Sequence, residues 1–151
     1  MEIVKTKQLT DAQFQQINQL WNDEYPAQLK DRFGILLDGV ENYHHYLIED
    51  EHNNTIAWAV DFKIANETRF SIIVHKEHQR KGLGKLLLKK LQEELGEFYG
   101  WVIDHNNDLK ENGEYYQSPL LFYVKNGFDV LYDIQIDTEM LKAVKIKNRT
   151  T

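Results

Sequence analysis

The sequence contains no cysteine and only two prolines in 151 residues. Without cysteine, the chain cannot form disulfide bridges, thiolate metal sites or a cysteine nucleophile. The histidine pair His44 and His45 shows no spacing typical of metal ligands, so we expect no metal. No apolar run reaches the roughly 20 residues of a membrane-spanning helix, and residues 1–5 lack the apolar core of a signal peptide. We therefore expect no membrane partner and a cytoplasmic location.

Negative charge outweighs positive charge overall, but cations are concentrated in one segment. The net charge is −6. Residues 80–90 nevertheless hold five cations, which are Arg80, Lys81, Lys85, Lys89 and Lys90. A local cationic cluster in an acidic chain predicts an anionic ligand at that point. It does not predict a nucleic-acid partner, because the basic charge of a nucleic-acid-binding protein normally dominates a whole face.

The same cluster stands where a strand is expected to turn into a helix. Residues 70–74 alternate as a strand does, and residues 85–91 have the pattern of a helix. Between them, residues 79–84 read Gln-Arg-Lys-Gly-Leu-Gly. The first N–H groups of a helix lack partners inside the helix and attract anions, and glycine lets a backbone approach a ligand closely. This combination is typical of a phosphate-binding site.

Three glycine-rich phosphate motifs compete for this segment. A Walker loop is excluded because the chain has no Gly-Lys-Ser or Gly-Lys-Thr run. A dinucleotide-binding fingerprint would need a third glycine where Leu87 stands. Asp104 does follow about 20 residues on, where a ribose-binding acid would be expected. A dinucleotide-binding module therefore stays open as an alternative.

The third motif matches in full. Gln79, Gly82 and Gly84 resemble the Q/R-x-x-G-x-G/A signature of the GCN5-related N-acetyltransferases (GNATs), and residues 122–128 resemble that family's F-Y-x-K-x-G-F stretch. The resemblance covers roughly residues 1–147. It implies that acetyl-CoA is the co-substrate, with its pyrophosphate at the loop and its pantetheine arm on the preceding strand. The cofactor-binding residues it implies are Ile72, Ile73, Val74, Gln79, Arg80, Lys81, Gly82, Leu83, Gly84 and Lys85.

The length fits one domain covering residues 1–151. Strands are expected at 2–6, 43–49, 55–64, 68–75, 101–104, 129–136 and 140–147, and helices after Thr10, within 23–40, from the motif to about Leu95, and from 118 to 127. The resulting order, βααβββαβαββ, mixes hairpins with strand–helix–strand units. It predicts an α+β fold with a central mixed, mostly antiparallel twisted sheet flanked by helices, and it resembles the GNAT fold.

The resemblance implies an N-acetyltransferase that moves an acetyl group directly to a primary amine of a small molecule or peptide. Tyr123 matches the family's tyrosine and is expected to act as the acid for the leaving thiolate, because a phenol is protonated at neutral pH. Tyr115 and Tyr116 are alternatives for this role. Asp104 and His105, at the end of the next expected strand, are the candidates for the general base. A catalytically silent CoA-binding regulatory module on the same fold is the alternative function.

Two further expectations concern surfaces. Residues 105–117 form a long polar insertion that, together with residues 24–38, should cover the acceptor site. Acidic side chains of these segments would make the mouth of the site suit a cationic amine; they are Glu24, Asp31, Asp38, Asp104 and Asp108. The last expected hairpin, residues 129–147, has edges that could pair two subunits into a homodimer.

Overall fold

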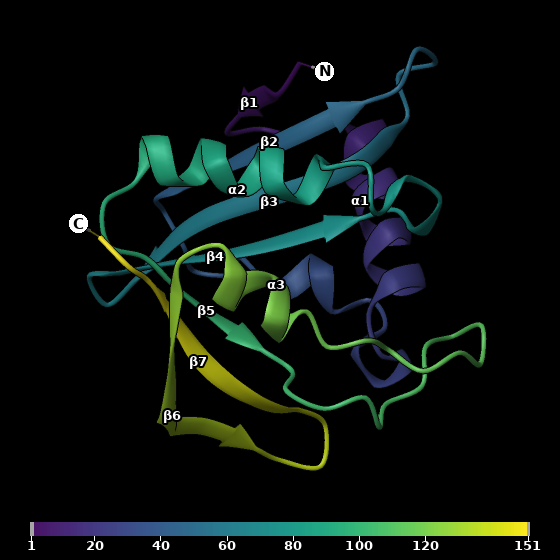
Figure 1. Ribbon diagram of the computed structural model, residues 1–151. Coiled ribbons are helices and arrows are strands. Elements are labelled where there is room, and N and C mark those ends of the chain that lie inside the picture. Colours follow the sequence, from purple (N-terminus) through teal and green to yellow (C-terminus); the bar gives the residue numbers. More distant parts are fainter. Residues whose placement is uncertain (1, 151) are drawn as a thin grey trace.

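A seven-stranded mixed sheet with helices on both faces forms the structure, a computed structural model that describes residues 2–150 (Figure 1). The strands are β1 (Val4–Thr6), β2 (Tyr43–Glu49), β3 (Thr55–Ile64), β4 (Glu67–Val74), β5 (Tyr99–Val102), β6 (Phe128–Asp137) and β7 (Lys142–Asn148). The α-helices are α1 (Asp11–Glu24), α2 (Leu83–Glu94) and α3 (Leu120–Lys125), and the 3-10 turns are η1 (Ala27–Leu29), η2 (Arg32–Ile35) and η3 (Lys76–His78). The strand order is β1-β2-β3-β4-β5-β7-β6; β4 and β5 pair in parallel, and the other neighbours are antiparallel.

The expected α+β class and the mostly antiparallel sheet are confirmed. One element differs, because the helix expected within residues 23–40 is replaced by the 3-10 turns η1 and η2. Pro26 precedes the first turn, and Asp31, with a φ of 63°, separates the two. Left-handed backbone cannot continue an α-helix, so this stretch follows an irregular path. No helix within residues 2–150 is long and apolar enough to cross a membrane.

Two hydrophobic cores lie on opposite faces of the sheet, because successive side chains of a strand point to opposite sides. On β2, Tyr46 and Ile48 belong to the core beneath α2, whereas Leu47 belongs to the core beneath α1. Figure 1 shows α2 and α3 on one face of the sheet and α1 on the other. Helix α1 begins at the expected capping box, in which the Thr10 hydroxyl accepts the Gln13 N–H at 3.1 Å.

Strands β4 and β5 diverge, and their divergence positions the site. Strands β3 and β4 are paired over the whole of residues 67–74, but β4 and β5 are paired only between Arg69 and Tyr99. Beyond that pair, the backbone of residues 70–74 has no strand partner on its β5 side. A ligand could therefore form hydrogen bonds with this edge from inside the sheet.

An aromatic cluster stands where the two strands part. The ring of Phe70 lies with its centroid 5.2 Å from that of Phe98, 5.5 Å from that of Tyr123 and 5.5 Å from that of Phe128. A Cβ added to Gly100 on β5 would lie 2.5 Å from the Phe70 ring, so glycine at this position lets the ring stand beside β5. The cluster thus joins α3 to the opening and brings Tyr123 to it.

Candidate functional site

The loop of residues 79–85 presents backbone N–H groups to one point. Arg80 and Gly82 have left-handed backbone, with φ of 64° and 82°. The first intrahelical hydrogen bond at the start of α2 runs from the Leu86 N–H to the Gly82 carbonyl at 2.9 Å. The N–H groups of residues 83–85 precede that bond and are available to a ligand. Donors arranged in this way at a helix N-terminus form an anion-binding nest.

A cavity of about 860 Å³ opens beside this loop, and we call it the α2-side cavity. Its lining residues are Glu24, Tyr25, Ile72, Ile73, Val74, His78, Gln79, Arg80, Gly82, Leu83, Gly84, Lys85, Tyr116, Gln117, Ser118, Pro119, Phe122, Tyr123, Lys125 and Asn126. Nine of the ten residues predicted to bind the cofactor are among them, and Lys81 is not. The Gln79 side-chain amide donates to the Val74 carbonyl at 2.9 Å and so holds the loop against the end of β4.

The charge of the α2-side cavity is predominantly positive. Arg80 and Lys85 come from the loop, and Lys125 comes from the end of α3. The carboxylate in the lining, Glu24, is already engaged: it accepts a backbone N–H at 3.1 Å and lies 3.7 Å from the Lys110 ammonium. Sequence reasoning did not assign Lys125 to this site, although it is the lysine of the F-Y-x-K-x-G-F stretch. A cavity of this charge suits a polyanionic ligand.

A second cavity, of about 290 Å³, lies where α1, β3, β4, β5 and β7 come together, and we call it the α1-side cavity. Its lining residues are Trp21, Tyr25, Leu29, Leu36, Phe62, Ile64, Arg69, Phe70, Ser71, Ile72, Gly100, Trp101, Val102, Ile103, Tyr116, Pro119, Tyr123, Leu141 and Ala143. Most of these side chains are aromatic or aliphatic. This cavity therefore suits an apolar ligand or the apolar part of one.

The two cavities meet at five residues, which are Tyr25, Ile72, Tyr116, Pro119 and Tyr123. The rings of Tyr25 and Tyr116 are in edge contact, with centroids 6.1 Å apart. Burial raises the pKa of Tyr25 to about 12, and it raises the pKa of Tyr116 and of Tyr123 as well. All three hydroxyls are therefore protonated at neutral pH and can donate hydrogen bonds.

Of the three tyrosines where the cavities meet, two were predicted from the sequence as candidates for the acid, and one was not. Tyr123 and Tyr116 were both candidates for the acid, and both line the point where the cavities meet. Tyr115, the other alternative, is 58% exposed and lines neither cavity. Sequence reasoning missed Tyr25, for which the available signal was its position directly after the apolar face of α1.

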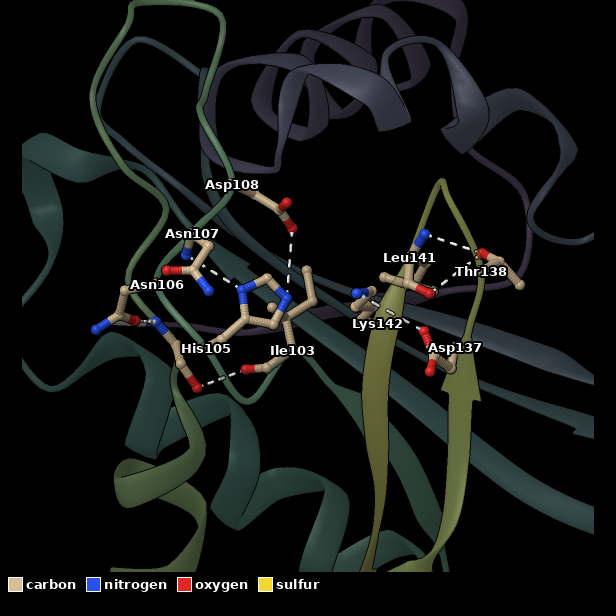
Figure 2. Close-up of polar contacts among 10 residues, drawn as sticks. Ile103, His105, Asn106, Asn107, Asp108, Asp137, Thr138, Leu141 and Lys142 are labelled. Carbon is tan, nitrogen blue, oxygen red and sulfur yellow. Dashed lines mark hydrogen bonds and ion pairs between the residues drawn. The ribbon is translucent and has the colours of Figure 1, made fainter.

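The candidates for the general base, Asp104 and His105, lie outside both cavities. His105 lines a third cavity of about 170 Å³, beside residues 138–141 of the turn between β6 and β7, and this cavity shares Leu141 with the α1-side cavity. Figure 2 shows its ring held within the insertion: Nδ1 accepts the Asn107 N–H at 3.1 Å, and Nε2 lies 3.9 Å from the Asp108 carboxylate. The structure does not bring this pair together with the three tyrosines.

Comparison with known proteins agrees with this geometry. A family model described as "Acetyltransferase (GNAT) domain" matches residues 41–130. Among solved structures, Escherichia coli ElaA is similar with a TM-score of 0.72 and 15% identity, covering 99% of this chain and 100% of its own. The aminoglycoside 6'-N-acetyltransferase from Enterococcus faecium has a TM-score of 0.71 and 12% identity, over 98% of this chain and 96% of its own. A phosphinothricin acetyltransferase from Sinorhizobium meliloti, solved in complex with AcCoA, has a TM-score of 0.62 and 16% identity, over 99% of this chain and 89% of its own.

These matches carry different weight. At such low identities, the solved structures show a shared fold. No curated protein sequence matches the chain. The family model, by contrast, spans more than half of the chain, from the sheet through the glycine-rich loop to the start of β6. The resemblance read from the two sequence motifs is therefore confirmed, and the chain belongs to the GNAT family of acetyltransferases.

Proposed function

We propose that this chain is an acetyl-CoA-dependent N-acetyltransferase that transfers an acetyl group directly to a primary amine. The observation that carries the proposal is the meeting of two cavities at Tyr25, Tyr116 and Tyr123, beside the opening between β4 and β5. One cavity is cationic and lined by loop backbone, whereas the other is largely apolar. Two substrates could therefore reach one point by different routes.

The residues of the α2-side cavity fit acetyl-CoA, which when bound would supply an activated acetyl thioester. The N–H groups of residues 83–85 would bind the pyrophosphate, and Arg80 and Lys85 would add charge-assisted hydrogen bonds. The backbone of residues 72–74, unpaired on its β5 side, would bind the pantetheine amides. Lys81, which is outside the lining, would contribute charge from a greater distance.

Tyr123 would serve the leaving group. In the transfer, the amine nitrogen bonds to the acetyl carbon, the carbon–sulfur bond breaks with its electrons on sulfur, and the nitrogen loses one proton. Burial raises the pKa of Tyr123 well above the value of about 8.5 for a thiol, so complete proton transfer to the thiolate would be uphill. The hydroxyl would instead stabilise the developing thiolate as a hydrogen-bond donor.

The proton of the amine needs a destination. Asp104 and His105 stay the predicted bases, and because neither lines the α1-side or the α2-side cavity they would act through a chain of water molecules. The α1-side cavity contributes in another way. Burial in apolar surroundings disfavours a charged ammonium and lowers its pKa, so binding there would itself favour the reactive neutral amine.

Calorimetric titration with acetyl-CoA is the first test. Gly82→Trp puts a bulky side chain on left-handed backbone inside the nest and should abolish binding, a loss of at least about 100-fold in affinity. Gly113→Trp is the matched control, because Gly113 also has a positive φ, of 86°, but lies in the insertion outside both cavities. NAD is titrated in parallel.

Thiol release with a panel of amines then tests turnover. Acetyl-CoA binding that only the Gly82 variant loses, together with amine-dependent thiol release, supports the proposal. Binding without release on any amine would favour the catalytically silent CoA-binding module. Binding of NAD in place of acetyl-CoA would contradict both and favour the dinucleotide-binding module.

A further inference from the structure

The α1-side cavity lacks the carboxylates that a cationic acceptor would need. Of the five acidic residues expected at the mouth of the site, none lines this cavity, and Glu24 alone lines the α2-side cavity. Within the part of the chain that the structure describes, Arg69 is the one charged side chain in the α1-side lining. The expectation of an acidic mouth is therefore not met at this cavity, and the sign of its charge is reversed.

A polyamine or an aminoglycoside would bind poorly in such a place. Moving an ammonium group out of water is costly unless an anion or several acceptors replace the lost hydration. The walls here include Trp21, Phe62 and Trp101, whose ring faces can attract one ammonium group, but among the described residues no carboxylate lines the cavity to balance further positive charges. The volume, about 290 Å³, is at the small end of ligand sites and matches one ring with short substituents.

Arg69 supplies a cation at one end of this apolar space. Its side chain and that of Ser71 point to the same face of β4, because alternate residues of a strand share a face. The Arg69 Nε lies 2.7 Å from a Glu67 carboxylate oxygen. A guanidinium has five N–H donors, so this contact engages only part of its donor capacity.

A second cation shares the same carboxylate. The Lys145 ammonium is bonded to the other oxygen of Glu67 and lies 5.7 Å from the centroid of the Trp101 ring, a ring that lines the cavity. Arg69 and Lys145 together outweigh the single charge of Glu67. This end of the cavity therefore carries a net positive charge that would repel a second ammonium group on an acceptor.

The distance to the reaction point fixes the geometry of the acceptor. Ile72 lies where the two cavities meet, and Arg69 lies three residues before it on β4. Three residues of a strand span about 10 Å, and the Arg69 side chain pairs with Glu67, which lies two residues further from Ile72 on the same strand. An amine at Ile72 and an anion at Arg69 would therefore stand at opposite ends of one small apolar body.

We propose that the acceptor is a monoamine on an aromatic or branched apolar body that carries a carboxylate at its far end, bound by Arg69. The inference rests on the proposed function, since it takes the α1-side cavity as the acceptor site. Arg69 touches the substrate tail and not the reacting atoms, so it determines specificity.

A matched series of three probes tests the inference. The probes are 4-(aminomethyl)benzoate, benzylamine and 4-(aminomethyl)benzylamine, which share an aminomethyl ring and carry a negative, a neutral and a positive tail. Binding is followed without acetyl-CoA by quenching of tryptophan fluorescence, because Trp21 and Trp101 line the cavity. Acetylation is followed separately by thiol release, with spermidine as a polycation.

The carboxylate probe should bind at least about tenfold more tightly than benzylamine, since hydrogen bonds to a charged group are the strong ones. The dication should bind most weakly. Arg69→Gln should remove the advantage of the carboxylate and leave benzylamine unchanged. The control is Arg149→Gln, because the Arg149 Nε also pairs with a carboxylate, that of Asp129 at 3.1 Å, but on the surface away from both cavities.

The two readouts separate the two proposals. Equal or tighter binding of the dication, or faster acetylation of spermidine than of the carboxylate probe, would overturn the inference and leave the acetyltransferase proposal standing. The predicted binding order without thiol release from any probe would support the ligand class and contradict the acetyltransferase. Because the order is measured first on the wild-type protein, the test stands even if Arg69→Gln does not fold.

Discussion

The two cavities that meet at Tyr25, Tyr116 and Tyr123 are built in opposite ways. The α2-side cavity takes its character from one short loop, whose backbone donors and cations would bind a polyanion. The α1-side cavity takes its character from side chains on α1, β3, β4, β5 and β7, most of them aromatic or aliphatic. The first cavity is therefore defined by backbone N–H groups and cationic side chains, and the second by packed apolar side chains, many of them aromatic.

This difference indicates which cavity can stay the same across a protein family and which can vary from one member to the next. Backbone N–H groups recognise phosphate whatever the neighbouring side chains are, so a glycine-rich loop tolerates variation around it. Side-chain walls change their shape and charge with each substitution. We therefore expect the α1-side cavity to decide which amine is used, and changes on the two sides to affect different measurements.

The largest loss of activity is expected from a change at Tyr123, where the two cavities meet. Tyr123→Phe removes the hydroxyl and keeps the ring in its aromatic cluster, so kcat should fall by at least about 100-fold while the affinity for acetyl-CoA changes little. Tyr115→Phe, at an exposed position outside both cavities, is the control and should leave kcat unchanged. An unaltered kcat in Tyr123→Phe would move the donor role to Tyr116 or Tyr25.

Acid should weaken the α1 face of the sheet through His45. Its Nδ1 accepts the Trp58 indole N–H at 3.0 Å. The pKa of His45 is lowered from 6.5 to about 4, mainly because the side chain is buried. Between those values the unfolded chain takes up a proton that the folded chain refuses. The His45 contribution should therefore lower stability as the pH drops from 6.5 to 4, by about 3 kcal/mol in all, and this contribution should not grow further below pH 4.

Urea unfolding at a series of pH values measures this loss. His45→Gln keeps an acceptor for Trp58 but cannot titrate, so its stability should depend less on pH across that window. His52→Gln, at an exposed position, should keep the wild-type slope. Equal slopes for all three proteins would show that another group causes the acid sensitivity.

The predictability of the two cavities differs for a physical reason. The loop of residues 79–85 could be read directly because its donors, glycines and cations are contiguous in sequence. Lys81 was the exception, since side chains leave a turn in several directions and sequence does not say which one faces a ligand. The α1-side cavity could not be read, because its walls join residues as distant as Trp21 and Ala143.

The fold shows the same limit. Strands β2 and β3 were predicted with the bounds that the structure has, because the turn-forming residues 50–54 mark where one strand ends and the next begins. The segment between Pro26 and Val40 has no such regular pattern, and in η2 the Phe33 side chain packs in the core beneath α1. Asp104 and His105 were assigned by their place after a strand, and sequence could not tell that the insertion turns His105 into a third cavity.

The opening between the strands can be tested at Gly100. Gly100→Ala would place a Cβ about 2.5 Å from the Phe70 ring, and that ring is confined by Phe98, Tyr123 and Phe128. Overpacking of this kind should lower the free energy of unfolding by about 2 kcal/mol, measured by urea unfolding. Gly96→Ala, where no atom lies within 4 Å of the added Cβ, should cause no such loss. A fully stable Gly100→Ala protein would show that the ring can move aside.

The smallest effect on binding is expected from a change at Lys125. It should distinguish the two cavities, because only binding in the α2-side cavity should respond to salt. Lys125 lines the α2-side cavity but is exposed, so Lys125→Gln should weaken acetyl-CoA binding by only about fivefold. The difference from the wild type should shrink at about 0.5 M NaCl, because exposed charges are screened, while fluorescence-detected binding of benzylamine stays the same in both proteins. Lys142→Gln, on an exposed lysine outside the α2-side cavity, controls for net charge. If both lysine variants weakened acetyl-CoA binding equally, the attraction would come from the charge of the whole protein and not from this wall of the cavity.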